Sequence, residues 1–429
     1  MPNKKLKVGN VPNLRFPEFE GEWEVIKLGE LSELITKGTT PKKFISEGIK
    51  FIKIECFDGD RINMQKCLFI DENVHKKELK RSELKENDLL FAIAGATIGK
   101  VNIVTEEILP ANTNQALAII RLKKNENPKF IYQILKSNIM QKYIKDNISV
   151  GAQPNLNLEQ INSFSFYNPL SSEQDKIATF LSLIDDRIQT QNKIIEGLKL
   201  SKKMLIKKIF NQQLSFDGGY NNKFPDWEEK KIKELFSFKI TNSFSREQLN
   251  YKNGKVKNIH YGDIHTRFQT LFNVEKEEVP YINPYINIDK INAENYCEIG
   301  DMIFADASED LIDVGKSIEI VNLNNQKLLA GLHTILARPI SNTFSIGFCG
   351  YLFKSDRIRT QIQKESQGSK VLSISAVRLS NISLFIPCIE EQIKITNFLS
   401  SIDSKIDIET RFLKKLEEQK KFLLQNLFV

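Results

Sequence analysis

Residues 173–189 read EQDKIATFLSLIDDRIQ, and residues 391–407 read EQIKITNFLSSIDSKID. The second stretch lies 218 residues after the first, and ten of the seventeen paired positions are identical. A solenoid repeats at a much shorter period of about 20–50 residues. The spacing therefore predicts two similar half-molecules, each made of one large domain and one helix. Such a chain suits a partner that has twofold symmetry of its own.

The duplication continues outside these helices. The only two tryptophans, Trp23 and Trp227, occupy the same place in their halves, and each is followed by glutamate. Pro169 and Pro387 stand just ahead of the two repeated stretches. Short apolar runs between turn residues predict a mixed domain with many short strands in each half. The clearest predicted strands are 89–94, 101–104, 116–122, 302–305, 317–321 and 333–338, and the predicted helices near the domain ends are 128–145 and 345–363.

An apolar stripe with 4-3-4-3 spacing runs along both repeated helices. A heptad pattern of this length is typical of coiled-coil packing. Polar residues interrupt the apolar stripe at matching places, which are Gln191 and Lys202 in the first helix and Glu409 and Lys420 in the second. We expect the helices to bury their stripes against each other as an antiparallel pair; the alternative is that each packs only on its own domain. The predicted seam residues are Ile177, Leu181, Ile184, Ile188, Ile195, Leu198, Ile395, Leu399, Ile402, Ile406, Leu413 and Leu416.

Composition places few limits on the partner. With 429 residues, of which 41% are hydrophobic and 27% charged, the chain is long enough for two or three domains. Its five cysteines include no Cys-x-x-Cys pair, which favours buried thiols over a metal site or disulfide framework. No apolar run approaches the ~20 residues that span a bilayer. We expect a cytoplasmic protein with no membrane partner, and the net charge of +7 favours a polyanionic partner only weakly.

Two matched features of each half resemble one protein family: the tryptophan-glutamate entry, and a proline followed by Glu-Gln-x-Lys-Ile…Phe-Leu-Ser-x-Ile-Asp. The chain resembles, over essentially its whole length, the DNA-specificity (S) subunit of type I restriction-modification enzymes. The repeat and the resemblance together predict an α+β fold. Two similar mixed α/β target-recognition domains are separated by two long antiparallel coiled-coil helices with pseudo-twofold symmetry. The expected segments are target-recognition domain 1 at 1–170, a central spacer helix at 171–214, target-recognition domain 2 at 215–387 and a C-terminal spacer helix at 388–429.

The resemblance also implies the function. It implies a noncatalytic subunit that binds double-stranded DNA and reads a bipartite site, one half with each domain. The helices would separate the domains and dock methyltransferase (M) subunits, two of them, and restriction/translocase (R) subunits would join the complex. The resemblance implies no cofactor in this chain, while S-adenosylmethionine, ATP and magnesium belong to the partner subunits. Exposed helix lysines are candidates for M-subunit docking, although such faces are usually only solvated: Lys202, Lys203, Lys207, Lys208, Lys414, Lys415, Lys420 and Lys421.

Several polar loops next to glycine or proline are candidates for DNA binding. Arginine and lysine recognise guanine, whereas asparagine and glutamine recognise adenine. Lys100 and Lys316 follow equivalent glycines and are more typical of phosphate contacts, which position the protein without reading sequence. For any single loop residue, the alternative is that it lies in an ordinary solvated loop that does not bind DNA. His333 lies in an apolar stretch and is expected to be a core histidine. The predicted DNA-binding residues are Lys37, Thr39, Thr40, Lys42, Lys43, Lys100, Asn112, Asn114, Gln153, Asn155, Asn157, Asn242, Arg246, His260, His265, Arg267, Lys316, Gln367, Ser369 and Lys370.

Signatures of catalysis are incomplete. The segment 94–101 is similar to a phosphate-binding loop, but it has one residue too few between its glycines, and Val101 replaces the hydroxyl that would bind magnesium. The segment 283–285, Asn-Pro-Tyr, lacks the second proline of the adenine-methyltransferase motif. Two other classes of function stay open. One is a stand-alone DNA-modifying enzyme, either a methyltransferase or a nuclease, and the other is a coiled-coil adaptor without DNA binding.

Overall fold

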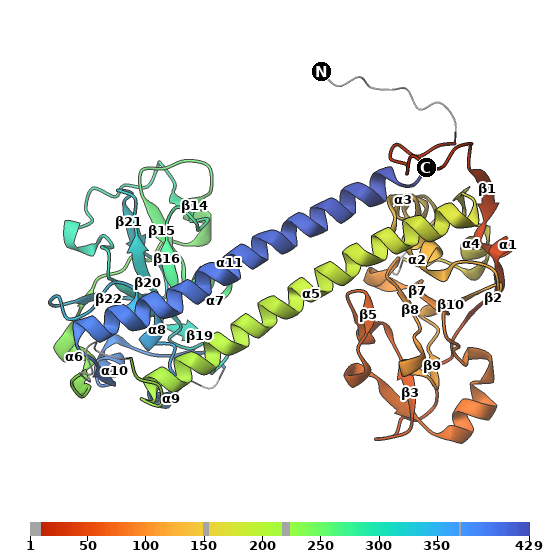
Figure 1. The fold of residues 1–429 in the computed structure, drawn as a ribbon. Coiled ribbons are helices and arrows are strands. Elements are labelled where there is room, and N and C mark those ends of the chain that lie inside the picture. The colour runs from red at the N-terminus through yellow and green to blue at the C-terminus, as the bar shows by residue number, and fades with distance from the viewer. Residues whose placement is uncertain (1–9, 149–153, 217–223, 369) are drawn as a thin grey trace, which may run out of the picture. The chain divides into compact units, whose positions relative to one another are not determined.

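The computed structural model describes residues 10–148, 154–216, 224–368 and 370–429. The chain forms two compact units, Met1–Lys193 with Thr410–Val429, and Ile194–Glu409. Two long helices, α5 (Ser171–Phe210) and α11 (Ile389–Asn426), each contribute one part to each unit. Each unit therefore contains one mixed α/β domain together with a segment of both helices (Figure 1).

The main sheet of the first unit has the order β2-β10-β7-β8, and its neighbouring strands are antiparallel. A smaller sheet has the order β6-β3-β9, and β1 pairs with β11 so that the beginning and end of the domain meet. The strands are β1 (Glu24–Lys27), β2 (Ser32–Lys37), β3 (Ile49–Ile52), β4 (Phe57–Asp58), β5 (Arg61–Ile62), β6 (Leu68–Ile70), β7 (Leu89–Ala92), β8 (Val101–Ile103), β9 (Ala111–Thr113), β10 (Leu117–Leu122) and β11 (Ser165–Asn168). The shorter helices are α1 (Leu28–Leu31), α2 (Pro128–Lys136), α3 (Asn138–Asn147) and α4 (Leu158–Ser163).

The second unit repeats this plan with a larger main sheet, β13-β22-β18-β20-β16, in which only the β16–β20 pair is parallel. Here β12 pairs with β24, and a second sheet has the order β14-β17-β15-β21. The strands are β12 (Glu228–Lys231), β13 (Phe236–Lys239), β14 (Leu249–Asn250), β15 (Lys257–Ile259), β16 (Leu271–Asn273), β17 (Tyr281–Ile282), β18 (Met302–Ala305), β19 (Ala307–Ser308), β20 (Ser317–Asn322), β21 (Leu328–Ala330), β22 (Thr334–Pro339), β23 (Leu372–Ser373) and β24 (Ser383–Ile386). The shorter helices are α6 (Ile232–Leu235), α7 (Tyr261–Thr266), α8 (Phe348–Leu352), α9 (Asp356–Glu365) and α10 (Ala376–Leu379).

The central strands β7 and β18 are apolar throughout because both of their faces are covered. In β7, Phe91 packs into the core formed with α2 and α5, while Leu90 belongs to the core on the other side of the sheet. In β18, Phe304 and Ile303 divide in the same way between two cores. A strand that is buried on both faces has a continuous apolar run instead of an alternating one. This explains the continuous apolar runs at 89–92 and 302–305 in the sequence.

Each predicted domain-end helix is broken in two. The first unit has α2 and α3 in place of one helix at 128–145, and the second has α8 and α9 in place of one at 345–363. The break falls at Ser137, whose hydroxyl donates to the Ile134 carbonyl (2.7 Å) and accepts from the Ile139 N–H (3.3 Å). Serine favours such caps because its side chain competes with helical hydrogen bonds. The matching Ser355 is also in an extended conformation, at the start of α9.

The long helices run antiparallel. In the first unit, Ile177 near the start of α5 lies in one buried cluster with Leu423 near the end of α11. In the second unit, Ile209 near the end of α5 shares a cluster with Ile395 near the start of α11. None of the twelve predicted seam residues is exposed. The prediction of two long antiparallel helices is therefore confirmed.

The repeated Glu-Gln pair fixes the entry into each long helix. The Gln174 amide donates to the Pro169 carbonyl (3.0 Å), and the Gln392 amide donates to the Pro387 carbonyl (2.9 Å). These bonds satisfy carbonyls that cannot join the helix. The identical residues of the repeat thus have a structural role at equivalent places.

Candidate nucleic-acid interface

The candidate loops of the first unit gather at one end of its main sheet. Lys37 at the end of β2 pairs with Ala118 near the start of β10, whose Leu117 pairs with Ala92 at the end of β7. Because these strands are antiparallel, the loops 38–43, 93–100 and 113–116 leave the sheet at the same end. The Gly95 N–H donates to the Pro154 carbonyl (3.1 Å), which brings the segment 154–157 to these loops.

Close packing joins these loops. A Cβ atom on Gly38 would lie 1.9 Å from the Thr113 carbonyl oxygen, so only glycine allows the two loops to approach. Beside it, the Thr40 hydroxyl donates to the Gln115 amide oxygen (2.6 Å). The predicted DNA-binding residues that are exposed in this unit are Lys37, Thr39, Thr40, Lys42, Lys43, Lys100, Asn155 and Asn157.

Some of the predicted residues of the first unit have structural partners, and one lies outside the described residues. The Asn157 side chain caps α4 by accepting from the Gln160 N–H (2.8 Å). Asn114 is half-buried and accepts from the Ala116 N–H (3.2 Å), which forms the turn before β10. Gln153 lies outside the described residues.

Asn112 does not fit the expectation of a base contact. It is completely buried, and its amide donates to the Leu79 carbonyl (3.0 Å) and the Ser82 hydroxyl (3.2 Å). Its carbonyl oxygen lies 2.5 Å from Nδ1 of the buried His75. All of its polar atoms are satisfied within the protein, so Asn112 holds strand β9 and its neighbours together and is not available to DNA in this structure.

The second unit gathers its loops in the same way. Lys239 at the end of β13 pairs with Leu336 in β22, and Ala305 at the end of β18 pairs with Thr334. The loops 240–248, 306–316 and 331–333 therefore lie at one end of the sheet. Strand β19 in the second loop pairs with β23, which brings in the segment 367–373. Gln367 and Lys370 are exposed in this segment, and Ser369 lies outside the described residues.

Three cationic side chains from separate loops meet around α7. The Arg246 guanidinium donates to both carboxylate oxygens of the buried Asp263 (2.9 and 2.7 Å). Arg267 donates to the Tyr251 hydroxyl (2.9 Å), and Lys316 donates to the backbone carbonyl of residue 265 (2.7 Å). Such oriented cations are suited to phosphates and to guanine edges.

Three histidines surround the Tyr261 ring, at centroid distances of 4.7 Å (His260), 6.0 Å (His265) and 5.3 Å (His333). His260 is buried, and its Nδ1 accepts from the Gly262 N–H (3.2 Å) at the start of α7. Burial, and then the charge of Arg246, lower the pKa of His260. The ring of His265 is half-buried, with Nε2 3.0 Å from the carbonyl of residue 307.

The expectation that His333 is a core histidine is wrong. Its side chain is 53% exposed, its backbone has φ of +55°, and its Nδ1 lies 3.2 Å from the Asp306 carboxylate. The apolar residues that suggested burial belong to the neighbouring strands, whereas His333 itself lies in the turn that precedes β22. Asn242, in contrast, is half-buried and donates to Asn258 (2.6 Å) and to the Ala330 carbonyl (2.9 Å), so it mainly stabilises its own loop.

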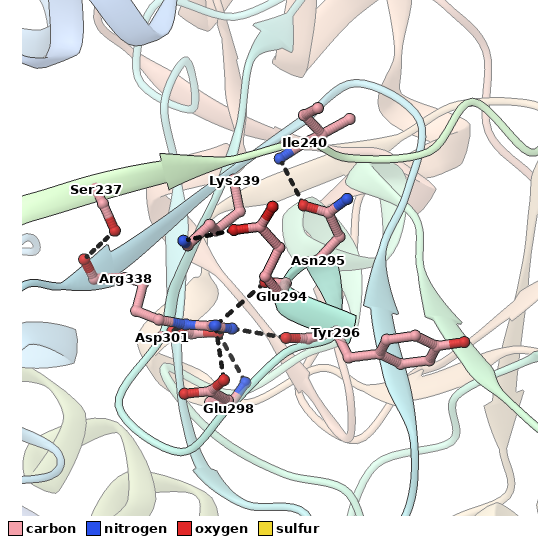
Figure 2. Close-up of polar contacts among 9 residues, drawn as sticks. All are labelled: Ser237, Lys239, Ile240, Glu294, Asn295, Tyr296, Glu298, Asp301 and Arg338. Atoms are coloured by element: carbon pink, nitrogen blue, oxygen red, sulfur yellow. Dashed lines mark hydrogen bonds and ion pairs between the residues drawn. The ribbon is translucent and has the colours of Figure 1, made fainter. Parts of the chain in front are cut away.

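A buried ion pair stabilises each main sheet away from these loops. Arg338 of β22 donates to both oxygens of Asp301 (2.9 and 2.8 Å) and to the Glu298 carboxylate (2.7 Å), as Figure 2 shows. In the first unit Arg121 of β10 binds both oxygens of Asp88 in the same manner (2.8 and 2.7 Å). The sequence reasoning missed these pairs, although Asp88 and Asp301 stand at matching turns before β7 and β18.

Two of the helix lysines are not available for docking. Lys420 is buried and pairs with the carboxylates of Asp185 and Asp60, and Lys202 pairs with Asp403. The expectation that Lys202 and Lys420 lie on an exposed face is therefore wrong, because both occupy seam positions. The remaining lysines of that set are exposed: Lys203, Lys207, Lys208, Lys414, Lys415 and Lys421.

Three further features concern metal binding, cysteines and membrane spans. Within the described ranges, no group of histidine, cysteine, aspartate or glutamate residues is arranged to hold a metal ion. Four of the five cysteines are buried and unpaired, as expected, and Cys388 is partly exposed. In the described part of the chain, no helix is both long and apolar enough to cross a membrane.

Comparison with known proteins agrees with this architecture. The family described as "Type I restriction modification DNA specificity domain" matches residues 20–200 and 225–418, which include both domains and most of both long helices. The chain therefore belongs to this family of DNA specificity proteins. The resemblance found from the repeat is confirmed.

Individual relatives match along almost the whole chain. The type I restriction enzyme MjaVIII specificity subunit of Methanocaldococcus jannaschii is 26% identical, over 96% of this chain and 93% of its own. The crystal structure of a type I restriction-modification system S subunit from M. genitalium has a TM-score of 0.56 at 16% identity, covering 98% of this chain and 99% of that one. A chain from a structural study of complex assembly in the type I system has a TM-score of 0.55 at 13% identity, covering 94% and 97%. At these identities the two structures support the fold.

Proposed function

We propose that this chain is a noncatalytic specificity subunit that reads a bipartite DNA site, one half with each domain. The observation that carries the proposal is that both units collect their polar loops at the same end of equivalent sheets. In each unit the buried strands β7 or β18 and their neighbours form a rigid base from which these loops emerge. Recognition loops on a rigid scaffold are a common arrangement for binding sites.

The two kinds of contact follow from side-chain chemistry. The exposed lysines Lys37, Lys42, Lys43 and Lys100 of the first unit suit phosphate contacts, which position the protein. Arg246 and Arg267 of the second unit are exposed and held in fixed orientations, so they suit guanine edges. Asn155 and Gln367 are exposed and suit adenine.

We propose that the long helices set the gap between the two half-sites. Helix α5 is continuous over 40 residues, about 60 Å at ~1.5 Å per residue. Successive major-groove faces of B-DNA lie only about 34–36 Å apart. Inserting about one helical turn after Leu198, with an equal insertion in α11, should lengthen the unspecified gap in the recognised sequence. An unchanged gap in this variant would count against the helices as spacers.

The partners in this proposal are two M subunits and R subunits. These subunits would carry out the reactions that use S-adenosylmethionine, ATP and magnesium. Support comes from the relatives, which are named specificity subunits. On α5 the exposed apolar side chains, which are the candidates for contact with a partner subunit, are Leu183, Ile194, Leu200 and Met204.

The direct test is to map methylated adenines in the host genome with and without this chain. The expected result is a two-part methylated motif that disappears when the chain is removed. Replacing the loops of the second unit should change one half of that motif and leave the other half intact. Binding of S-adenosylmethionine by the isolated chain would instead favour a stand-alone methyltransferase, and the absence of any DNA shift by the assembled complex would favour an adaptor.

A further inference from the structure

The motif aspartates connect the long helices to the domains in both units. In the first unit, Asp185 accepts from the Gln133 amide (2.8 Å) and pairs with Lys420. A second carboxylate, Asp60 in the hairpin of β4 and β5, pairs with both Lys420 (3.1 Å) and Lys136. These residues form a corner between the long helices and the domain. Both lysines of this corner therefore face a carboxylate from the chain itself.

The second unit repeats the corner without the second carboxylate. Asp403 accepts from the Tyr351 hydroxyl (2.7 Å) and pairs with Lys202. Tyr351 and Lys354 each lie 218 residues after their counterparts, Gln133 and Lys136. Among the residues that the structure describes, however, the Lys354 ammonium has no hydrogen bond or ion pair. Among the described residues of this unit, no carboxylate pairs with Lys354 as Asp60 pairs with Lys136 in the first.

A basic pocket of about 190 Å³ lies at this place. Arg359 donates to the carbonyls of residues 312, 314 and 315, which holds the loop before β20 against α9. Within the described ranges, Arg359 forms no ion pair with a carboxylate. Asp313 is the one acidic side chain in the lining, and it lies 3.5 Å from Lys316. The residues that line the pocket include Ile312, Asp313, Lys316, Phe353, Lys354 and Arg359.

The charges around this pocket favour the binding of an anion. Lys354 is exposed, yet burial around its ammonium and repulsion from Lys202 and Lys316 lower its pKa to about 8. Burial likewise lowers the pKa of Lys136 in the first unit to about 8; the Asp60 carboxylate opposes that shift, as the Asp403 carboxylate opposes the shift of Lys354. Three lining cations and one carboxylate leave an excess of positive charge that a bound anion would neutralise.

We propose that the pocket of Lys316, Lys354 and Arg359 binds a phosphate of the DNA backbone, so that only the second domain carries this anchor. The proposal rests on the DNA-binding function proposed above. Lys316 lies at the start of β20, at the end of the sheet where the candidate loops emerge, so a duplex contacting those loops passes close to the pocket. A phosphate would occupy the position equivalent to the Asp60 carboxylate. The second domain would then contribute more than the first to the part of the binding free energy that does not depend on DNA sequence.

The test compares Lys354→Gln with its matched control, Lys136→Gln. The full chain, assembled with its methyltransferase subunits, is titrated with a mixed-sequence duplex at several salt concentrations. Each neutralised phosphate contributes about 0.9 to the slope of log K against log salt. We expect the slope to become shallower by about 0.9 in Lys354→Gln and to stay unchanged in Lys136→Gln. Lys354→Arg should retain the slope, because it keeps the charge.

Thermal stability separates a lost contact from a damaged fold. Lys354→Gln removes a cation that faces other cations, so the melting temperature should stay the same or rise. Lys136→Gln takes a partner from Asp60, so the melting temperature should fall. A Lys354→Gln variant that loses DNA affinity together with stability would overturn the proposal, as would an unchanged salt slope.

Inorganic phosphate distinguishes a free ligand from DNA. If phosphate raises the melting temperature of the wild type more than that of Lys354→Gln, while the salt slopes agree, the pocket takes free phosphate and the DNA anchor is refuted. An unchanged slope with intact DNA binding refutes only this inference. Failure of the wild-type complex to bind any duplex would refute the proposed function as well.

Discussion

The paired lysines in the helix seam offer a sharp test of the packing. Lys420→Met removes an ammonium that is 11% exposed and that pairs with both Asp185 and Asp60. The Asp185 carboxylate, also 11% exposed, would keep only the Gln133 amide. Lys202→Met is the matched change in the second unit, where Asp403 is 34% exposed and keeps the Tyr351 hydroxyl.

The two changes should differ in magnitude. Removing one partner of a buried ion pair costs about 3–5 kcal/mol, whereas exposed pairs contribute about 0.2–1 kcal/mol. Asp60 is 38% exposed and keeps Lys136, so we take the lower end, about 3 kcal/mol, for Lys420→Met. The better-solvated Asp403 places Lys202→Met near 1 kcal/mol.

The assay uses the chain's two tryptophans, since Trp23 lies in the first unit and Trp227 in the second. In a Trp227→Phe background, urea unfolding followed by tryptophan fluorescence reports on the first unit, and a Trp23→Phe background reports on the second. Lys420→Met should destabilise the first unit more than Lys202→Met destabilises the second. Equal losses, or the reverse order, would refute the argument from burial. Adding Asp185→Leu to Lys420→Met should restore part of the loss, because an apolar pair replaces a broken ionic one.

Three further predictions concern other parts of the molecule. Arg338→Met leaves Asp301, which is 1% exposed, without its cation and should cost the second unit about 3–5 kcal/mol in urea unfolding followed at Trp227; no loss would mean that the pair of Figure 2 is unimportant. Burial raises the pKa of Glu319 from 4.5 to about 7, so the folded unit holds a proton that the unfolded chain releases. Wild-type stability should therefore fall by about 3 kcal/mol between pH 4.5 and 7 relative to Glu319→Gln, and parallel pH profiles would contradict this. Asp60→Asn removes the carboxylate that pairs with Lys136, while Lys420 keeps Asp185, and should steepen the salt dependence of DNA binding in the first domain if the anion argument is correct; an unchanged slope would weaken it.

The features predicted correctly are those with a strong local or repeated pattern. The seam of α5 and α11 was visible because an apolar heptad occurs twice at a fixed offset, and two matched stripes can bury each other. Strands β7 and β18 were visible because burial on both faces requires a continuous apolar run. The polar exceptions in the seam were a further signal. Lys202 and Lys420 recur at the same position, which indicates a specific buried partner instead of a solvated face.

The errors concern residues whose environment depends on distant parts of the chain. Asparagine is a residue type that can read bases, but His75 and the 79–82 segment surround Asn112 only after folding. His333 is next to apolar residues in sequence, yet its backbone turns it toward solvent and Asp306. The break at Ser137 depends on one hydroxyl that satisfies both adjacent helix ends, which a 3.6-residue periodicity does not reveal.

The distribution of the repeated residues indicates how recognition and framework are separated. The identical positions include Glu173 with Glu391, Gln174 with Gln392, and Asp185 with Asp403, and all of these bind the beginning of a helix or the domain beside it. None of the seventeen-residue repeat belongs to the loops at the ends of the main sheets. The two halves thus share their framework contacts and differ in the surfaces proposed to meet DNA. A change of loop sequence can therefore alter one half of the recognised site without disturbing the contacts that hold the helices together.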